Sequence, residues 1–259
     1  MTSVPCAAVR APAQAGRDGP AVPGLVGVLG GMGPLATIDF MRKMIEATPA
    51  SADQDHVPVL VSSIPQVPDR TLAFRGEGES PLAAMVASAR RLVAAGAGLL
   101  VVPCNTAHLW FDEIRETVGL PMLHIVDAAI EAAVDAGGAS GRIGLLATDA
   151  TLASGLYVNR APSHGTVRWL LPTAGEMLDL VMPGVAAVKA GQLQDGEALL
   201  SKAAAALARR GAGAIVLGCT EIPVVLRPAD TPVPLIDATA VLARRAVAWS
   251  LAQRGNRSS

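Results

Sequence analysis

Two cysteines of the chain lie in matching sequence contexts. Cys104 begins the segment CNT after the apolar run at 98–103, and Cys219 begins CTE after the apolar run at 213–218. We expect both thiols at the carboxyl ends of strands, near the start of the next helix, where backbone N–H groups and the helix dipole lower a thiol's pKa. One free cysteine is most often a buried structural residue. Two at matched positions, each followed by threonine within two residues, favour a chemical role.

The chemistry that suits two opposed thiols is proton transfer on both faces of one carbon atom. One thiolate removes a proton from one face, and the other thiol delivers a proton to the opposite face, which inverts the carbon centre. A disulfide oxidoreductase usually carries a C-x-x-C motif, which the chain lacks. A zinc site needs more ligands: His108 follows Cys104 by four positions, but Cys219 has no equivalent histidine nearby.

The elements that must position these residues alternate along the chain. Apolar runs predict strands, several of them covered on both faces. The segment 80–95 has apolar residues at helical spacing, with Ser80 as N-cap, Pro81 at the first helical position and Gly96 at the C-terminal turn. The alternation predicts an α/β fold with mainly parallel sheets. The predicted strands cover residues 24–29, 57–62, 98–103, 122–126, 142–147, 167–171, 213–218 and 233–236.

The chain also contains an internal sequence repeat. GAGLLVVPCNT at 96–106 aligns with GAGAIVLGCTE at 211–221, which places the second cysteine 115 positions after the first. GLVGVLGG aligns with GRIGLLAT at an offset of 117, and IVDA aligns with LIDA at an offset of 110. We therefore predict two pseudo-symmetric parallel-sheet α/β domains from an internal duplication, over 23–127 and 128–238. The cleft between them, beyond the carboxyl ends of the strands, is the expected ligand site.

Composition excludes several classes of protein. The chain has 259 residues and a net charge of −1, which gives no electrostatic signal for nucleic acid or a membrane surface. Mean hydropathy is +0.42, yet no apolar run reaches the roughly 18 to 20 residues of a membrane helix. Three cysteines form no disulfide framework, so a reducing, cytoplasmic setting is expected. Residues 1–22 are read as a disordered tail, with Cys6 as a surface thiol without a role.

Five segments carry a family resemblance. VGVLGGMGPLAT, IPQVPDRT, VPCNTAH, VKAGQL and LGCTEIP resemble the aspartate/glutamate racemase family, and most closely its aspartate racemase branch. The resemblance runs from about Gly24 to the late 240s. It implies an active site between two domains and catalysis without pyridoxal phosphate, another cofactor or a metal. Cys104 and Cys219 match its acid–base pair, and a last helix at about 239–254 is expected to pack back on the first domain.

The resemblance also implies how an amino acid substrate is held. Asn105, Thr106 and Thr220 match residues that bind the α-carboxylate, and their side chains can supply hydrogen-bond donors. Arg70 of the PDR segment and Lys189 of the KAG segment resemble the cations that hold substrate carboxylates. The expected function is therefore racemisation of aspartate. Family members are often homodimers, which is the expectation for this chain.

The glycine loop after the first strand has two interpretations. Gly31-x-Gly33-x-x-Ala36, with Asp53 twenty positions after the second glycine, loosely fits a dinucleotide fingerprint and leaves a nucleotide-binding oxidoreductase open. The resemblance instead predicts a tight turn beside the substrate, with Met32 and Gly33 at the site. We favour the turn because no other nucleotide-handling feature accompanies the loop.

Other functions and roles stay open. Within the superfamily, a glutamate, broad-specificity amino acid or hydantoin racemase would use the same two thiols, whereas a decarboxylase relative would need one. A non-catalytic binding protein for small acids would keep the cations without needing both thiols. His108 is expected to tune Cys104 or to be structural, and His124 to be a core residue. Asp127 and Asp237 are expected to cap helices, and the role of Tyr157 is open.

Overall fold

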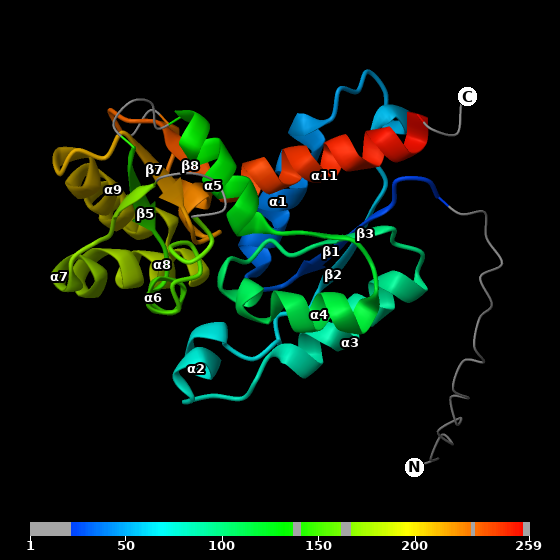
Figure 1. The fold of residues 1–259 in the computed structure, drawn as a ribbon, viewed down its shortest axis with the longest axis horizontal. Coiled ribbons are helices and arrows are strands. Elements are labelled where there is room, and N and C mark those ends of the chain that lie inside the picture. The colour runs from blue at the N-terminus through cyan, green and yellow to red at the C-terminus, as the bar shows by residue number, and fades with distance from the viewer. Residues whose placement is uncertain (1–21, 137–140, 162–166, 229–230, 256–259) are drawn as a thin grey trace, which may run out of the picture.

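A computed structural model describes residues 22–136, 141–161, 167–228 and 231–255. The predictions for Cys6 and for nearly all of the tail at 1–22 lie outside the described residues. The described chain contains two four-stranded sheets flanked by helices (Figure 1), and every strand pair is parallel. The predicted α/β fold with two parallel sheets is therefore confirmed.

The two sheets have the same strand order, which is the structural mark of the duplication. The first sheet has the order β2-β1-β3-β4 and the second β6-β5-β7-β8, so each strand of one half has a counterpart at the same place in the other. The strands are β1 Val26–Gly30, β2 Val59–Ser63, β3 Leu99–Val101, β4 Met122–Leu123, β5 Arg142–Leu146, β6 Arg168–Leu170, β7 Ala214–Leu217 and β8 Leu235–Asp237.

Helices cover both faces of each sheet. The first half of the chain contributes α1 Pro34–Ala47, α2 Arg70–Arg75, α3 Leu82–Ala94, α4 Phe111–Val118 and α5 Ile125–Ala136, and α5 contacts β7 and β8 of the second sheet. The second half contributes α6 Asp149–Ala153, α7 Ala174–Glu176, α8 Met182–Lys189, α9 Leu193–Arg209, α10 Ile222–Val225 and α11 Ala238–Gly255. Helix α11 contacts α1, α5 and strands of both sheets. The division at residues 127 and 128 stays a prediction.

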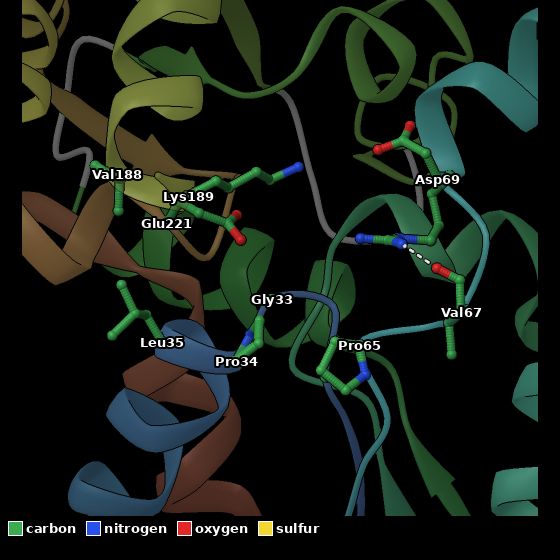
Figure 2. A pocket seen from close by; sticks show the side chains of 11 residues that line it. Gly33, Pro34, Leu35, Pro65, Val67, Asp69, Val188, Lys189 and Glu221 are labelled. Carbon is green, nitrogen blue, oxygen red and sulfur yellow. Dashed lines mark hydrogen bonds between the residues drawn. The ribbon is translucent and has the colours of Figure 1, made fainter. Parts of the chain in front are cut away.

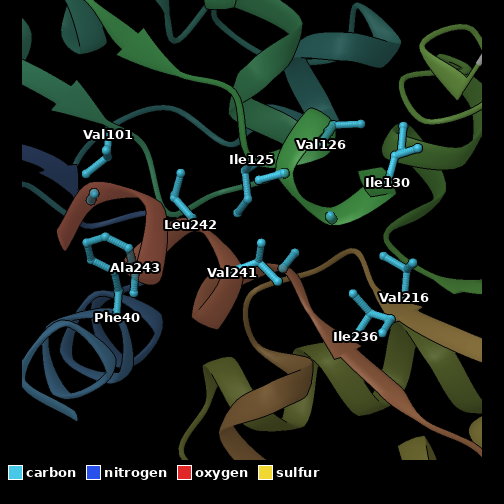
Figure 3. Packing of buried hydrophobic residues seen from close by; sticks show 14 of the residues in the cluster. Phe40, Val101, Ile125, Val126, Ile130, Val216, Ile236, Val241, Leu242 and Ala243 are labelled. Atoms are coloured by element: carbon cyan, nitrogen blue, oxygen red, sulfur yellow. The ribbon is translucent and has the colours of Figure 1, made fainter. Parts of the chain in front are cut away.

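The central strands are buried on both faces because their alternate residues enter different cores. Val26 and Val28 of β1 belong to a core that also contains Ile143 and Val216 of the second sheet; we name it the shared core. Leu29, the neighbour of Val28, belongs instead to a core under α3 and α4. Helices α5 and α11 fill the space between the sheets, and Figure 3 shows their apolar side chains packed there. The two halves are thus joined by continuous hydrophobic packing.

Three local predictions need correction. Helix α3 begins at Leu82 with Pro81 as its N-cap, so the prediction of Ser80 as N-cap and that of Pro81 at the first helical position are each wrong by one residue. Gly96 has a left-handed φ of 94°, as suits the predicted C-terminal turn. The strand predicted at 122–126 ends at Leu123. Helix α5 takes over from Ile125, because the apolar run continues into a helix that is buried between the two sheets.

The two aspartates of the third repeat match, Asp127 and Asp237, have different contacts. Asp237 accepts a hydrogen bond from the Ala240 backbone N–H at 3.0 Å and so caps α11, as predicted. Asp127 lies inside the first turn of α5. Its carboxylate binds the Arg160 guanidinium through two hydrogen bonds of 2.7 and 2.8 Å, so the prediction that it caps a helix is wrong.

Candidate active site

The carboxyl ends of the central strands meet at a pair of adjoining cavities. Eight of the nine residues predicted for the site line the inner cavity, and Gly33 lines the outer one. The outer cavity has a volume of about 430 Å³, within the range of small-molecule pockets. Asp69 and Glu221 line both cavities. The eight residues are Met32, Arg70, Cys104, Asn105, Thr106, Lys189, Cys219 and Thr220.

The two thiols come from opposite halves of the molecule. Cys104 follows the end of β3, and Cys219 follows the end of β7, which is the counterpart of β3 in the second sheet. Both cysteines are free and only 6% and 5% exposed, yet both face the inner cavity. The predicted meeting of the two thiols at one inter-domain cavity therefore agrees with the structure.

The electrostatic setting of Cys219 differs from the prediction. Its thiol donates a hydrogen bond to Glu221 Oε2 at 3.1 Å. Burial, followed by the negative charge of Glu221, raises the pKa of Cys219 well above its usual value, and Lys189 only partly opposes this. The expected lowering of the pKa is wrong for this residue. The helix after it, α10, has only four residues, and its dipole does not offset the effect of burial and of the carboxylate.

Polar groups without protein partners point to where a ligand would bind. The phenol of Tyr157 donates to Asn105 Oδ1 at 2.6 Å. Among the described residues, Asn105 Nδ2 and Thr220 Oγ1 are buried without a hydrogen-bond partner. Buried polar atoms of this kind normally bond to something, and both side chains line the inner cavity. The Thr106 hydroxyl is different, because it lies 3.0 to 3.1 Å from the hydroxyls of Thr148 and Thr151.

Arg70 is held by its own loop. Its Nη1 donates to the carbonyl oxygens of Val67 and Pro68 at 3.1 and 2.9 Å, and Figure 2 shows Val67 beside this contact. Asp69, the preceding residue, caps α2 by accepting from the backbone N–H groups of Thr71 and Leu72. These contacts fix the guanidinium at the cavity wall, while Arg70 Nε lacks a partner among the described residues.

Lys189 approaches from the opposite side. It is the last residue of α8, and its amine extends over the cavity near Glu221 (Figure 2). Removal from water lowers the pKa of Lys189, but the negative charge of Glu221, followed by those of the two cysteines in their thiolate forms, outweighs this and raises it overall. Lys189 is therefore a cation at neutral pH.

The glycine loop forms the wall between the cavities and β2. Gly31 has a φ of 88°, and a Cβ atom there would lie 2.4 Å from the Ile64 backbone nitrogen, so only glycine fits. Pro34 begins α1 as predicted. Gly33 faces the second half, where a Cβ atom would lie 3.1 Å from Glu221 Oε1.

His108 has a structural role. Its Nδ1 lies 2.8 Å from the Cys104 carbonyl oxygen, and its Nε2 accepts from the Ile125 N–H at 3.2 Å. Burial lowers the pKa of His108 to about 4, so the ring is neutral and both nitrogens are engaged. Within the described ranges, no group of three histidine, cysteine or acidic side chains is arranged to hold a metal.

Sequence reasoning missed four residues that line the inner cavity, and it left the role of Tyr157 open; the four are Asp69, Thr71, Thr148 and Glu221. Asp69 and Glu221 stood inside the recognised motifs, next to predicted residues, and Glu221 is also the repeat counterpart of Thr106. The change from threonine to glutamate between these two repeat positions was the signal that could have identified Glu221. The sequence drew attention to Tyr157 but did not predict its contact, since Tyr157 and Asn105 lie 52 positions apart in the chain.

Comparison with known proteins places the chain among amino acid racemases. The pattern of the Asp/Glu/Hydantoin racemase family matches residues 29–246. The chain belongs to this family. Members of the family are isomerases that act on amino acids, which agrees with the predicted enzyme class and with two thiols at one cavity.

Individual relatives of this racemase cover most of its length. It is 28% identical to the broad specificity amino-acid racemase RacX of Bacillus subtilis over 88% of this chain and 99% of the relative. Aspartate racemase from Picrophilus torridus superposes with a TM-score of 0.77 at 28% identity, over 87% and 94% of the two chains. Glutamate racemase from Francisella tularensis, at 17% identity and a TM-score of 0.65 over 89% and 81% of the chains, shares the fold. Within the described residues, no helix has the length and hydropathy needed to cross a bilayer.

Proposed function

We propose that this racemase interconverts the L and D forms of an amino acid by two-base proton transfer between Cys104 and Cys219. The observation that carries the proposal is that two free thiols from opposite halves line one cavity, beside buried polar groups without partners. In each direction one cysteine acts as thiolate and takes the α-proton. The other acts as thiol and gives its proton to the opposite face, so one S–H bond forms as the other breaks.

Stabilisation of the α-carbanion is electrostatic in this scheme. Negative charge spreads from the α-carbon into the α-carboxylate as the proton leaves. Asn105 Nδ2 and Thr220 Oγ1 are buried and unpartnered in the described structure, so they are free to donate to that carboxylate. Donors held in place before the reaction stabilise developing charge without reorganisation.

Aspartate is the proposed substrate. Arg70 and Lys189 reach the cavity from different halves, and each supplies a positive charge for one of two carboxylates. The likeness to the aspartate racemase of Picrophilus torridus supports this choice. The resemblance further supports a homodimer, and two free thiols support a reducing, cytoplasmic setting.

A specific observation favours a second candidate, a broad-specificity amino acid racemase. Asp69 and Glu221 line the same cavities as Arg70 and Lys189, so the protein's own carboxylates already balance the two cations. A substrate with no net charge suits such a pocket as well as a dicarboxylate does. RacX, the broad-specificity relative, supports this reading.

Substrate entry requires the site to open. The inner cavity has a volume of about 10 Å³, which is enough for a single water molecule. An amino acid is several times larger. The walls that would move are side chains of α2 and α8, which come from opposite halves, and closing again over the substrate would exclude water.

The decisive experiment is a chiral assay without added cofactor. Purified enzyme is incubated in deuterated water with each enantiomer of aspartate, glutamate and several neutral amino acids, and both enantiomeric excess and deuterium at the α-carbon are measured. We expect racemisation with deuterium incorporation, and its loss in both Cys104→Ala and Cys219→Ala. Full activity in either variant refutes the two-base scheme, and activity only on neutral substrates refutes the aspartate assignment.

A further inference from the structure

The two thiols have different partners although the folds around them match. Position 221 follows Cys219 by two residues, as position 106 follows Cys104, so Glu221 is the repeat counterpart of Thr106. The Thr106 hydroxyl interacts with threonine hydroxyls of the other half. The Glu221 carboxylate instead accepts the hydrogen bond of its own cysteine thiol at 3.1 Å. The pseudo-symmetry of the site is therefore broken at this pair of positions.

The carboxylate of Glu221 is held in place. The residue is 4% exposed, and its Oε1 has no hydrogen-bond partner among the described residues. Gly33 of the opposite half lies against Oε1, since a Cβ atom there would approach to 3.1 Å, and Figure 2 shows the two close together. On this side the carboxylate is therefore bordered by the glycine loop, and a larger residue than glycine at position 33 would crowd it.

Several charged groups face this thiol and carboxylate from other elements. Lys189 of α8 is positively charged, and it opposes the effect of Glu221 on the pKa of Cys219. Asp69 and Arg70 line the same cavity from the start of α2. Burial and Glu221 together outweigh Lys189, so the pKa of the Cys219 thiol stays raised. Tyr157, whose pKa is raised by burial and by Cys219, is a neutral phenol.

We propose that Glu221 is a positioning residue that keeps Cys219 in the thiol form, so that the free enzyme accepts the α-proton at Cys104 and delivers a proton from Cys219. The inference rests on the proposed racemase function. In the favoured half-reaction the substrate C–H bond breaks as the Cys104 S–H bond forms, and the Cys219 S–H bond breaks as the new C–H bond forms. The enzyme is left with a Cys104 thiol and with a Cys219 thiolate beside a carboxylate. Cys219 then takes a proton from solvent and Cys104 releases one to solvent, which restores the resting form.

A resting enzyme with one thiolate and one thiol at fixed positions should treat the two enantiomers differently. The two enantiomers have equal free energy in water, so kcat/KM must be the same in both directions. The asymmetry therefore shows in kcat and KM separately, with one enantiomer giving the higher value of both. Replacing Glu221 by glutamine removes the negative charge and keeps the shape of the side chain, so it should bring the two kcat values closer together.

The test measures each thiol directly. The rate of alkylation by iodoacetamide is followed against pH, with peptide mass spectrometry separating Cys104 from Cys219, in the wild type and in Glu221→Gln. We expect the profile of Cys219 to move to lower pH by about 1 to 3 units and that of Cys104 to move much less. Glu197→Gln, the same change on the exposed face of α9, should leave both profiles and turnover unchanged.

Alkylation needs no turnover, so it separates this inference from the proposed function. If the chain racemises no amino acid, the function fails while the profiles still report on Glu221. If racemisation occurs but Cys219 titrates alike in the wild type and Glu221→Gln, or both cysteines shift equally, the inference is overturned. Glu221→Asp keeps the charge on a shorter side chain and should shift Cys219 less than glutamine does; an equal shift also overturns it.

Discussion

At the scale of single residues, the amide of Asn105 depends on a phenol that is far away in the chain. Tyr157 is fully buried, donates to Asn105 Oδ1 at 2.6 Å and packs edge-to-face on Trp169. With the oxygen bound to Tyr157, the amide nitrogen of Asn105 is left for the inner cavity. We therefore expect Tyr157 to act on the site as a residue that orients a donor, a role that the sequence left open.

Removing the Tyr157 hydroxyl tests this role. Tyr157→Phe keeps the ring against Trp169 and loses only the hydrogen bond, so we expect kcat to fall by about 5- to 10-fold, or about 1 kcal/mol, with a smaller change in KM. Steady-state racemisation of both enantiomers measures this. Tyr157→Leu, which also loses the ring packing, should lower the melting temperature far more. An unchanged kcat in Tyr157→Phe would show that Asn105 needs no orientation.

What the sequence revealed about residues follows from how local each signal is. A repeated motif identifies the two cysteines and the polar residues that follow them, and the fold brings these residues to one cavity. The motif does not predict which side chain a cysteine thiol contacts. Glu221 contacts Cys219 because the turn after β7 directs the carboxylate back to the sulfur, and the glycine loop of the other half borders the same carboxylate.

At the scale of elements, strands were predicted better than the junctions between them. All eight predicted runs overlap a strand. The central strands β1, β3 and β7 are buried at every position, and a parallel strand buried on both faces is apolar throughout. The error at 122–126 arose because the first turn of α5 is equally apolar. This turn is buried between the sheets, and short apolar runs do not distinguish a strand from a buried helix.

Two histidines hold this junction together and predict its pH dependence. His108 and His124 lie edge-to-face beside the start of α5. Burial lowers the pKa of His108 to about 4, and burial followed by the neighbouring His108 lowers the pKa of His124. Below pH 6.5, which is about the pKa of histidine in the unfolded chain, the unfolded chain therefore binds protons that the folded chain does not bind. Stability is fully present above pH 6.5 and falls as the pH drops towards 4.

The expected loss is about 1 to 2 kcal/mol per histidine between pH 6.5 and 5. Urea unfolding at pH 7.5, 6.5 and 5 measures it. His108→Gln cannot take up a proton, so its stability should decline less with acidification than that of the wild type, even though it starts lower through the lost hydrogen bonds. A parallel decline in the variant and the wild type would place the pH sensitivity elsewhere.

At the scale of the whole molecule, the duplication suggests two independent domains, but the packing unites them. The shared core contains β1 and β3 residues of the first sheet and β5 and β7 residues of the second, with α5 and α11 between them. Each half also has a core of its own, under α3 and α4 in the first and around α8 and α9 in the second. The site lies where the halves meet, so relative movement that opens it must leave the shared core intact.

Cooperative unfolding of the two halves follows from this packing. Leu242 of α11 is completely buried in the shared core, and Leu242→Ala should cost about 2 to 5 kcal/mol. Both sheets depend on that core. Two variants that each keep one tryptophan, Trp110 in the first half or Trp169 in the second, should therefore report one common midpoint of unfolding. Adding Leu242→Ala should lower the midpoint equally in both variants. Two separated transitions, or a shift confined to one tryptophan, would mean that each half is stabilised by its own core. The opening of the active site would then have to be described as the motion of two loosely coupled domains rather than of walls on one packed body.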